Sequence, residues 1–404
     1  MDESGLVLGF QTEYFPPDPS SNAMLYGRLV ERLSPILARV DVVSAGPHAA
    51  GGTTTTPSYP TNIRVTRCPP PSWRLRRSLV TRFFSEVWFS SRNSFVAARS
   101  SADWTVLLSS TPPLLLGAGA TLVARWRRIP SVWWVQDLHP EIAVALGLAS
   151  DRSVSFRLLH AVHAWILARA ELVIVISEAQ RRALLDAYPS VPARKVTVLE
   201  NPATHQARPS AREPSDRLII TYTGNLGLSQ GLDHVLHVAD RVRDLPVHFV
   251  LHGRGNAEPA LRDLASNLQL DNVTFSGLVG DEEYSVLLQQ SDVLLVSLRP
   301  GIDQYSFPSK LWTYLAAGRP LLACVGRGGA VEETVSTSGA GVVTTWGETE
   351  PCIAAVKELL DADRRSEMAA AAVRFYADHL TPEEHAISLA ALISQASEAR
   401  NPTK

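Results

Sequence analysis

The stretch Phe307-Pro-Ser-Lys-Leu-Trp-Thr-Tyr-Leu-Ala-Ala-Gly-Arg-Pro320 is typical of a short helix that follows a loop. Apolar residues at 292–297 precede it and predict a buried strand. Ser309 suits the N-cap and Gly318 the position just after the last turn, so Lys310 belongs to the first turn. Free backbone N–H groups and the helix dipole favour an anion there, and a cation opposes the dipole by ~0.3–1 kcal/mol. A bound phosphate would explain Lys310, and the alternative is a solvated lysine that the helix tolerates.

The chain length of 404 residues allows two domains or one large one. A hydrophobic content of 45% with 19% charged residues is enough for sizeable cores. The net charge of −2 predicts no general attraction to nucleic acid or to a membrane. The three cysteines, Cys68, Cys324 and Cys352, are too scattered along the chain for a metal cluster or a disulfide framework. This usage fits a reducing cytoplasm best.

No signal peptide is expected, because the chain begins Met1-Asp-Glu and the apolar run after it is short. The longest uncharged stretch, 104–124, is nearly long enough to span a bilayer, but Ser109-Ser-Thr-Pro-Pro113 interrupts it. A strand at 104–109 followed by a helix at 114–125 explains this stretch better. We therefore predict a soluble protein.

Short β-rich apolar runs alternate with helical patterns along the chain. The predicted strands are 6–10, 40–44, 63–67, 104–109, 131–135, 171–176, 195–199, 218–223, 246–252, 272–275, 292–297, 320–325 and 341–345. The predicted helices include 156–168, 178–187, 232–242, 259–268, 282–290 and 353–360. Continuous apolar strands indicate parallel sheets that are covered on both faces. The sequence therefore predicts an α/β protein with two doubly wound domains that face each other across a cleft.

The segment 202–216 predicts a linker, because it has three prolines, little apolar content and mixed charge. We assign residues 1–205 to the first domain and residues 206–380 to the second. The tail at about 364–398 is rich in alanine and is predicted to be helical, and residues 381–404 are expected to form a C-terminal helix that crosses back to the first domain.

In sheets of this kind, ligands bind beyond the carboxyl ends of the strands. The segment Thr223-Gly-Asn-Leu-Gly227 follows the first strand of the second domain, and Gln230 precedes the next helix. Gly224 and Gly227 would let backbone N–H groups approach a phosphate closely, beside Asn225. The alternative is a tight turn between a strand and a helix.

Two further loops of the second domain lie at the same edge of its sheet. Gly253-Arg-Gly255 places Arg254 there, either for a bidentate phosphate contact or as a solvated side chain. Gly326-Arg-Gly-Gly329 precedes a helix that begins near Ala330, with Glu332 in its first turn. Glu332 would complement the helix dipole or accept hydrogen bonds from sugar hydroxyls.

In the first domain, Asp137, His139 and Glu141 follow a strand closely. One histidine with two carboxylates is a poor metal ligand set, so we predict no metal site and place Asp137 or His139 in the cleft as a polar group. The alternative is that Asp137 caps the next turn. The proline-rich loop 13–23 could shape an acceptor pocket, with Tyr14 and Asn22 as its candidate residues.

Residues 73–101 combine basic and aromatic side chains in a helical pattern. The basic residues are Arg74, Arg76, Arg77, Arg82, Arg92 and Arg99, against a lone Glu86. The apolar residues near helical spacing are Leu75, Leu79, Phe83, Val87 and Phe95, with Phe84, Trp88 and Phe89 beside them. This combination predicts contact with a membrane surface through 73–99, and the alternative is an ordinary helix with its apolar stripe inward. Nucleic acid is not expected as a partner.

Together these segments resemble the family-4 glycosyltransferases of GT-B fold, especially bacterial enzymes of the colanic-acid and O-antigen assembly type. The resemblance extends from about residue 10 to 360. Its motifs are Trp134-Val-Gln-Asp-Leu-His-Pro-Glu141, Val173-Ile-Val-Ile-Ser-Glu178, Val198-Leu-Glu-Asn-Pro202, Tyr222-Thr-Gly-Asn-Leu-Gly227 with Gln230-Gly231, and Pro308-Ser-Lys310 with Ala316-Ala-Gly-Arg-Pro320. Any one motif is weak, but in this order they are fairly specific.

The resemblance implies a retaining, metal-independent transferase of the hexosyl or N-acetylhexosaminyl type, without a cofactor. A nucleotide-diphosphate sugar would bind mainly to the second domain. The acceptor would be a glycan or a polyprenyl-linked sugar on the first domain, at the inner face of the cytoplasmic membrane.

Two departures from the family pattern concern the donor site. The family has a Glu, seven residues and a second Glu, and those positions here look like Tyr305 and Thr313. Thr313 lies one turn beyond Lys310 and is expected to face the same site, with one hydroxyl in place of a carboxylate. Gln230 stands near a position where the family has a lysine. Lys310 would then supply more of the charge for the diphosphate, helped by Arg254 or Arg299.

The expected chemistry is stabilisation of the leaving diphosphate by Lys310, by the helix N-terminus at Ser309 and by the N–H groups of 224–227. Asp137 and His139 would orient the acceptor hydroxyl. One alternative is a catalytically silent protein that binds a sugar nucleotide as a sensor or as the partner of an active transferase. The other alternative is a nucleotide-sugar epimerase of the same fold.

Overall fold

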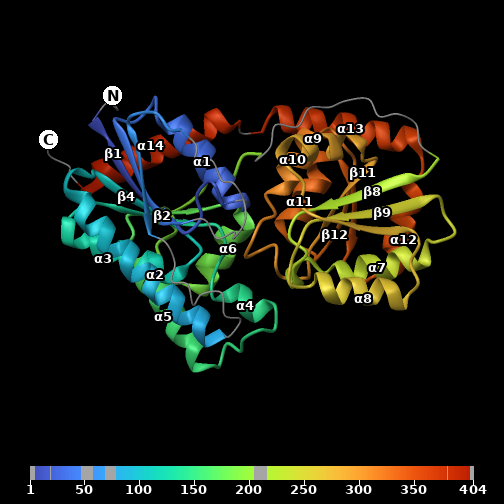
Figure 1. Cartoon of the computed structure of the whole chain (residues 1–404), viewed down its shortest axis with the longest axis horizontal. Coiled ribbons are helices and arrows are strands. Elements are labelled where there is room, and N and C mark those ends of the chain that lie inside the picture. The colour runs from blue at the N-terminus through green and yellow to red at the C-terminus, as the bar shows by residue number, and fades with distance from the viewer. Residues whose placement is uncertain are drawn as a thin grey trace. The chain divides into compact units, whose positions relative to one another are not determined.

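The computed structural model describes residues 5–18, 20–46, 58–68, 79–203, 216–379 and 381–400. It divides into two compact units, one of residues 1–201 with 380–404 and the other of residues 202–379. Each unit is a parallel sheet with helices on both faces (Figure 1). The prediction of two doubly wound sheets is confirmed. The segment predicted as a linker lies largely outside the described residues.

The first unit contains a seven-stranded sheet in the order β3-β2-β1-β4-β5-β6-β7. Its strands are β1 (Val7–Gln11), β2 (Arg39–Ala45), β3 (Ile63–Cys68), β4 (Val106–Ser110), β5 (Ser131–Val135), β6 (Leu172–Val175) and β7 (Val196–Val198). All neighbours pair in parallel, as continuous apolar strands predict. The strand order changes direction between β1 and β4.

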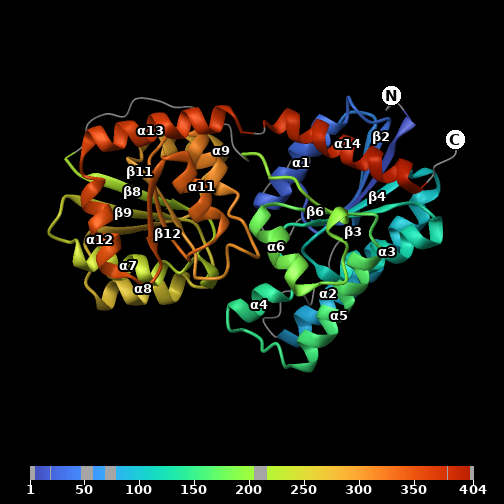
Figure 2. The ribbon, with the colours of Figure 1, turned by 180° about the vertical axis from the view of Figure 1, so that it is seen from behind.

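Helices of the first unit cover the sheet in two layers (Figures 1 and 2). One layer consists of α1 (Ser21–Leu33) and α14 (Pro382–Arg400), which pack on each other over β1, β4 and β5. The other layer consists of α2 (Leu79–Ser100), α3 (Leu114–Arg127) and α5 (Val154–Arg169). The shorter elements are η3 (Ser101–Asp103), α4 (Glu141–Ala145), α6 (Glu178–Ala187) and η4 (Ala193–Lys195).

The second unit contains a six-stranded parallel sheet in the order β10-β9-β8-β11-β12-β13. Its strands are β8 (Leu218–Thr223), β9 (Val247–His252), β10 (Val273–Ser276), β11 (Val293–Ser297), β12 (Leu321–Val325) and β13 (Gly341–Thr345). The order changes direction between β8 and β11, and a crevice at such a point is where α/β sheets bind ligands.

Two helical layers also cover the second sheet (Figures 1 and 2). One face packs on α7 (Leu232–Arg241), α8 (Glu258–Asn267) and α12 (Thr349–Glu358). The other has α9 (Asp281–Gln290), α10 (Lys310–Ala316), α11 (Ala330–Ser338) and α13 (Ala362–Ala377). The short η5 (Leu228–Gln230) precedes α7.

The tail that the sequence predicts to be helical contains two helices, α13 and α14, and α14 falls within the C-terminal helix predicted at 381–404. Thr381 and Glu384 form a capping box that starts α14: the Thr381 amide donates to Glu384 Oε2 at 2.9 Å, and the Glu384 amide donates to Thr381 Oγ1 at 3.2 Å. Pro382 at the first helical position favours the same start. The helix α14 then packs against α1 in the first unit.

Two of the three cysteines are close together in the fold although they are far apart in the sequence. Cys324 on β12 and Cys352 on α12 are buried free thiols whose sulfur atoms lie 3.4 Å apart. These two cysteines are therefore close in space although they are 28 residues apart in the chain.

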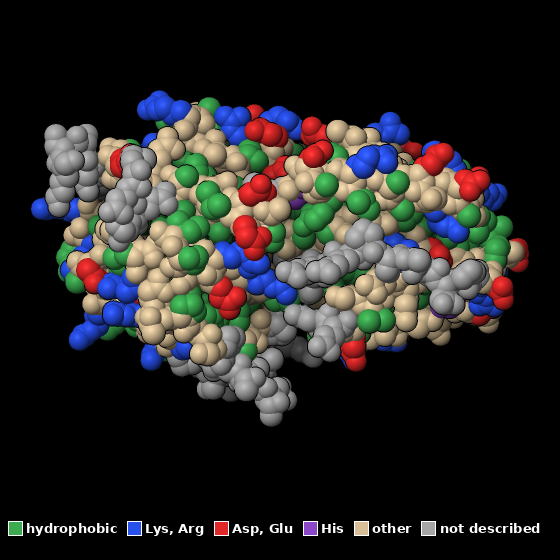
Figure 3. Space-filling model, turned by 90° about the horizontal axis from the view of Figure 1, so that it is seen from above, with side chains coloured by type: hydrophobic (Ala, Val, Ile, Leu, Met, Phe, Trp, Pro, Cys, Tyr) green, Lys and Arg blue, Asp and Glu red, His purple; other side chains and the backbone are tan. Residues whose placement is uncertain are grey.

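The surface offers two observations on partners. On the face shown in Figure 3, Lys and Arg side chains are interspersed with Asp and Glu, as the net charge of −2 leads one to expect. Within the described ranges, no helix is both long and apolar enough to cross a bilayer.

Candidate functional site

The helix α10 begins at Lys310, as predicted, with Ser309 at the N-cap. Ser309 has helical backbone angles and its side chain makes no capping hydrogen bond. Gly318 follows the helix with a φ of 63°, the left-handed conformation that glycine adopts most readily. The sequence therefore located this helix correctly, although Ser309 does not cap it through its hydroxyl.

The Lys310 ammonium is an enclosed cation. Part of the side chain reaches the surface, but Nζ is buried and has no hydrogen-bond partner among the described residues. It lies 3.7 Å from the centroid of the Tyr222 ring, a cation–π contact. Burial lowers the pKa of Lys310 to about 7. A buried ammonium without an acceptor is costly, so this group is suited to an anion that would supply the missing partner.

Gly224 lies next to the Lys310 ammonium. It follows β8 with a φ of 120°, and a Cβ built there would lie 3.1 Å from Lys310 Nζ. Lys310 follows the loop after β11, so the two residues meet where the strand order changes direction. The predicted anion site is thus at the point of the sheet where a ligand is expected.

Two glycine loops, after β8 and β9, are bonded to each other. The Gly224 amide donates to the His252 carbonyl at 2.9 Å, and the Leu226 amide donates to the Arg254 carbonyl at 2.9 Å. Gly253 has a φ of 144°, and a Cβ on it would lie 1.8 Å from the Gly224 carbonyl oxygen. Only glycine therefore allows the loops to approach this closely.

This pairing changes the predicted set of backbone donors. The amides of Gly224 and Leu226 are already used, whereas those of Asn225 and Gly227 have no acceptor among the residues that the structure describes. The expectation that all N–H groups of 224–227 point to a phosphate is therefore wrong for two of them. Asn225 and Gly227 remain as donors.

Tyrosines hold the loop after β8 in place. The Tyr222 hydroxyl lies 2.7 Å from the Asn225 carbonyl oxygen and 2.9 Å from Gln230 Oε1. The Tyr314 hydroxyl accepts from the Thr223 amide at 2.9 Å. Gln230 therefore fixes the loop from within. Burial raises the pKa of Tyr222 and of Tyr314 well above the ordinary value, so both phenols stay neutral.

The other predicted donor residues are less available. Arg254 is largely exposed and pairs with Glu258 at 3.3 Å. Arg299 is engaged too, since it donates to both carboxylate oxygens of Asp233 at 2.9 Å. Thr313 is completely buried, so the structure does not present its hydroxyl to a ligand. Glu332 accepts a hydrogen bond from the Gly328 amide and so closes its own loop.

Sequence reasoning missed Asp303, which lies in the loop between β11 and α10. Its side chain is buried, and burial raises its pKa to about 6. No periodic or motif signal points to this residue, because it precedes the stretch that predicts the helix.

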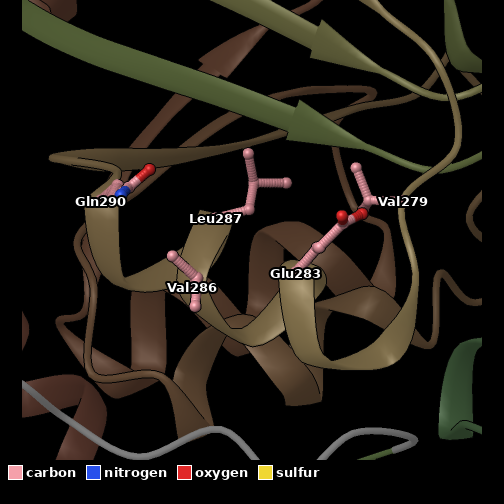
Figure 4. A pocket seen from close by; sticks show the side chains of 5 residues that line it. All are labelled: Val279, Glu283, Val286, Leu287 and Gln290. Carbon is pink, nitrogen blue, oxygen red and sulfur yellow. The ribbon is translucent and has the colours of Figure 1, made fainter.

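A surface cavity of about 440 Å³ lies on α9 (Figure 4). It is lined by Val279, Glu283, Val286, Leu287 and Gln290. None of the residues predicted for the donor site lines it, and its charged side chain is a carboxylate. It is therefore unsuited to a phosphate.

In the first unit, the loop after β5 is held by side chains from distant segments. Gln136 and Asn201 exchange hydrogen bonds of 2.7 and 3.4 Å, which joins two of the sequence motifs. The Asp137 amide donates to Thr111 Oγ1 at 3.1 Å. The side chains of Asp137 and His139 are half-buried. The loop is thus a defined platform that carries two polar groups.

Glu141 closes a buried chain of hydrogen bonds behind this loop. Trp133 Nε1 donates to His163 Nε2 at 3.1 Å, so the proton of this neutral histidine is on Nδ1, 3.1 Å from the Tyr188 hydroxyl. Tyr188 in turn donates to Glu141 Oε1 at 2.6 Å, and His160 Nδ1 lies 2.9 Å from the same oxygen. Glu141 therefore braces the loop.

The alternative role of Asp137, a cap of the next turn, is not found, because no side chain caps α4. Asn22 is at the start of α1, where Ser20 Oγ accepts from the Ala23 amide at 3.3 Å. Tyr14 and Asn22 are both half-buried, at the carboxyl edge where β1 ends.

Comparison with known families agrees with this geometry. Residues 26–202 match a family model described as a glycosyl transferase 4-like domain, and residues 217–362 match one described as glycosyl transferases group 1. The chain belongs to the family-4 glycosyltransferases. The two matched segments correspond to the two sheets, so the family resemblance seen in the motifs is confirmed.

Two curated relatives are also similar to this glycosyltransferase-family chain. WcaI of Escherichia coli (strain K12), named a glycosyl transferase of colanic acid biosynthesis, is 28% identical over 226 residues, which are 52% of this chain and 55% of WcaI. WbjE of Pseudomonas aeruginosa, named a glycosyltransferase, is 25% identical over 245 residues, 58% of this chain and 61% of WbjE. The chain thus spans less than two thirds of the length of these relatives.

Solved structures of other proteins share the GT-B fold. A sucrose-phosphate synthase from Thermosynechococcus elongatus has a TM-score of 0.79 at 16% identity, covering 98% of this chain and all of its own. Anabaena HepE in complex with UDP-glucose has a TM-score of 0.70 at 13% identity, and the match covers 96% of this chain and 100% of HepE. WaaG, a glycosyltransferase of lipopolysaccharide biosynthesis, has a TM-score of 0.68 at 13% identity, and the match covers 96% of this chain and 99% of WaaG. At these identities the similarity establishes the fold of this family-4 chain.

Proposed function

We propose that this protein transfers a sugar from a nucleotide-diphosphate sugar to a glycan or lipid-linked acceptor in the biosynthesis of cell-surface polysaccharide. The observation that supports this most is the Lys310 ammonium, buried without a hydrogen-bond partner beside Gly224. A diphosphate would supply the missing acceptor. The family of the chain, the name of WcaI and the UDP-glucose bound to HepE make a sugar nucleotide the fitting source of that diphosphate.

Lys310 would act on the leaving group. As the bond between the sugar and the diphosphate breaks, negative charge grows on the phosphate oxygens, and preorganised donors there contribute about 3–4 kcal/mol each. The ammonium of Lys310 and the amides of Asn225 and Gly227 are such donors. Because Lys310 already provides a cation, we propose that the reaction uses no metal ion and no other cofactor.

Retention of configuration is the stereochemical outcome that we propose. In this route a leaving phosphate oxygen takes the proton of the acceptor hydroxyl on the same face of the sugar, so no strong protein base is needed. The first unit would hold the acceptor, with Asp137 and His139 orienting its hydroxyl and with Tyr14 and Asn22 beside them. Half-buried polar groups on a braced loop suit this role.

We also propose that the protein binds the inner face of the cytoplasmic membrane through α2. On this helix the side chains of Phe84 and Phe95 are 57% and 62% exposed, whereas Phe89 is buried against the sheet. The helix thus has an inner apolar stripe and an outer aromatic one. Arg92 stacks over Trp88 at 5.2 Å, and Arg99 over Phe95 at 5.7 Å. Aromatic side chains with arginine beside them suit an interface with anionic lipid. The predicted contribution of residues 73–78 lies outside the described part of the chain.

Binding and turnover with a panel of nucleotide sugars test the proposal. A thermal-shift screen with UDP-, GDP-, TDP- and ADP-sugars is expected to find a donor that stabilises the wild-type protein. Turnover of that donor, with acceptor or as slow hydrolysis, is expected to fall by about 100-fold or more in Lys310→Ala. Lys357→Ala, which removes an exposed lysine on α12, is the matched control.

Three results would contradict the proposal. Unchanged turnover in Lys310→Ala would remove this residue from the reaction. Binding without transfer or hydrolysis would indicate a silent sugar-nucleotide protein. A changed sugar without an acceptor would indicate an epimerase.

A further inference from the structure

Asp303 is a second buried charge in the loop that ends at Lys310. Its side chain is 3% exposed, and its Oδ2 atom has no hydrogen-bond partner among the described residues. A carboxylate oxygen that is removed from water without a donor is costly for the free protein. A ligand that brings a hydrogen-bond donor to Oδ2 would remove this cost.

Gly329 allows the carboxylate to lie where it does. A Cβ built on Gly329 would lie only 1.4 Å from Asp303 Oδ2, so the loop after β12 has a glycine where Asp303 packs against it. The φ of Gly329 is −92°, which any residue can adopt, so the requirement for glycine is steric. Glu332, in the first turn of α11, adds negative charge near Asp303. The surroundings of the Asp303 carboxylate therefore favour hydrogen-bond donors over anions.

Asp303 and Lys310 lie along one edge of the sheet. Lys310 meets the loop after β8, and Asp303 meets the loop after β12, with β11 between these two strands. Neighbouring strands are about 4.8 Å apart, so two strand spacings separate the two positions by on the order of 10 Å. A molecule with an anion at one end and hydroxyls at the other has this reach. Asp303 lies in the loop between β11 and α10, which leads directly into Lys310, the first residue of α10, so one rearrangement of that loop would move both charged groups.

We propose that Asp303 recognises hydroxyl groups of the donor sugar, and so determines specificity in place of the glutamates absent at Tyr305 and Thr313. The proposal rests on the proposed function, since it assumes that the diphosphate of a sugar nucleotide binds at Lys310. An ionised carboxylate accepts from a pair of sugar hydroxyls, whereas an amide at this position offers one accepting oxygen and an NH₂ group that cannot accept a hydrogen bond. The sugar class is then one with hydroxyls free to donate at the carbons remote from the diphosphate.

The test compares a nucleoside diphosphate with its sugar conjugate in titration calorimetry. UDP, GDP, TDP and ADP are titrated first, and then the hexose conjugate of whichever nucleotide binds. The wild type is expected to bind the conjugate more tightly than the bare nucleotide. Asp303→Asn is expected to lose about 10- to 100-fold of affinity for the conjugate and to keep its affinity for the bare nucleotide within two-fold.

Two further variants separate charge from structure. Gly329→Ala leaves the carboxylate charged but displaces it, and is expected to lose affinity for the conjugate as Asp303→Asn does. Glu333→Gln, which alters an exposed acid in the same turn as Glu332, is expected to bind like the wild type.

The inference is overturned if Asp303→Asn keeps the full preference for the conjugate. It is equally overturned if the variant loses both ligands together, which indicates a structural role, or if the wild type does not prefer the conjugate. If no nucleotide binds the wild type, the proposed function fails and this inference fails with it. If bare nucleotides bind and only the sugar preference is insensitive to Asp303, the inference alone fails.

Discussion

The ammonium of Lys310 lies over the face of the Tyr222 ring, with 3.7 Å between Nζ and the ring centroid. The aromatic face offsets part of the cost of burying a charge, but it supplies no hydrogen-bond acceptor. The free protein therefore holds this cation at the expense of stability. A site that stores such a cost before its ligand arrives gains affinity for an anion when the ligand binds.

Replacing Lys310 by methionine is expected to separate stability from binding. Methionine fills a similar volume without a charge, so the free protein should unfold at a higher temperature near pH 7. Each kcal/mol gained should raise the melting temperature by about 2–4 °C. A nucleoside diphosphate should raise the melting temperature of the wild type further, and this additional increase should be absent in Lys310→Met. Differential scanning calorimetry with and without nucleotide measures both effects, and a variant less stable than the wild type would contradict this account.

The stability of the free wild type should increase with pH above about 7. Burial lowers the pKa of Lys310 to about 7, below its value in the unfolded chain, so the unfolded state binds more protons between pH 7 and about 10.4. This group therefore contributes up to about 1.4 kcal/mol per pH unit of added stability across that window. Urea unfolding of the wild type and Lys310→Met at pH 7 and pH 9 measures the difference, which should narrow at the higher pH.

The affinity for a nucleoside diphosphate should change in the opposite direction. Only the protonated Lys310 attracts an anion, and in the free protein this form is lost as the pH rises through about 7. Binding at pH 8 should take up a proton and be up to about ten-fold weaker than at pH 7. Calorimetry in buffers of different ionisation enthalpy detects the proton, and its absence would show that Lys310 does not meet the phosphate.

Gly253→Ala should unfold the paired loops of the second unit. A methyl group there would lie 1.8 Å from the Gly224 carbonyl oxygen, and the φ of 144° is strained for any residue with a Cβ. We expect a loss of about 3 kcal/mol or more in the free energy of unfolding. Gly280→Ala is the matched control, because a Cβ at Gly280 would have no atom within 4 Å. The free energies of unfolding of the two variants, measured by chemical denaturation, should differ by most of that loss. Equal denaturation midpoints would refute the close packing of Gly253 against Gly224.

His163 should make the first unit sensitive to acid. Burial lowers its pKa to about 3, while in the unfolded chain the pKa is near 6.5, so the unfolded state binds the extra proton between these values. Stability is then lost as the pH decreases from 6.5 towards 3, by up to about 1.4 kcal/mol per unit. His163→Gln can keep both the bond from Trp133 and the bond to Tyr188, and it does not titrate. The slope of unfolding free energy between pH 6.5 and 4 should be smaller in this variant, and identical slopes would count against the neutral histidine.

The exposed phenylalanines of α2 should bind lipid. The double variant Phe84→Ser with Phe95→Ser removes two exposed rings, each worth about 1.5–3 kcal/mol on burial, so its partition to anionic vesicles should be at least about ten-fold weaker. Leu278→Ser, which removes an exposed apolar side chain in the second unit, is the control. Sedimentation with vesicles measures the bound fraction. Equal binding of the double variant and the control would disprove this role of α2.

Much of the fold follows from local patterns. All thirteen predicted strands exist, with ends shifted by at most two residues, because a buried parallel strand requires a continuous apolar run that is visible in the chain. The start of α10 at Lys310 and the glycine that ends it were equally predictable, since they depend on neighbouring residues. The start of α14 also follows from local sequence, because Thr381, Pro382 and Glu384 together are a recognisable start signal.

The state of each candidate side chain depends on residues far away in the chain. The Lys310 ammonium is enclosed because Tyr222 in β8 and Gly224 just after it lie against it, and Thr313, only one turn further, is completely buried. Asp303 Oδ2 lies against Gly329, which follows a different strand, and has no hydrogen-bond partner among the described residues. Local sequence sets backbone preferences over a few residues, and these are short-range steric and hydrogen-bonding effects. Desolvation and charge pairing depend on what surrounds an atom in three dimensions, so only the folded chain decides which polar groups are left to bind a ligand.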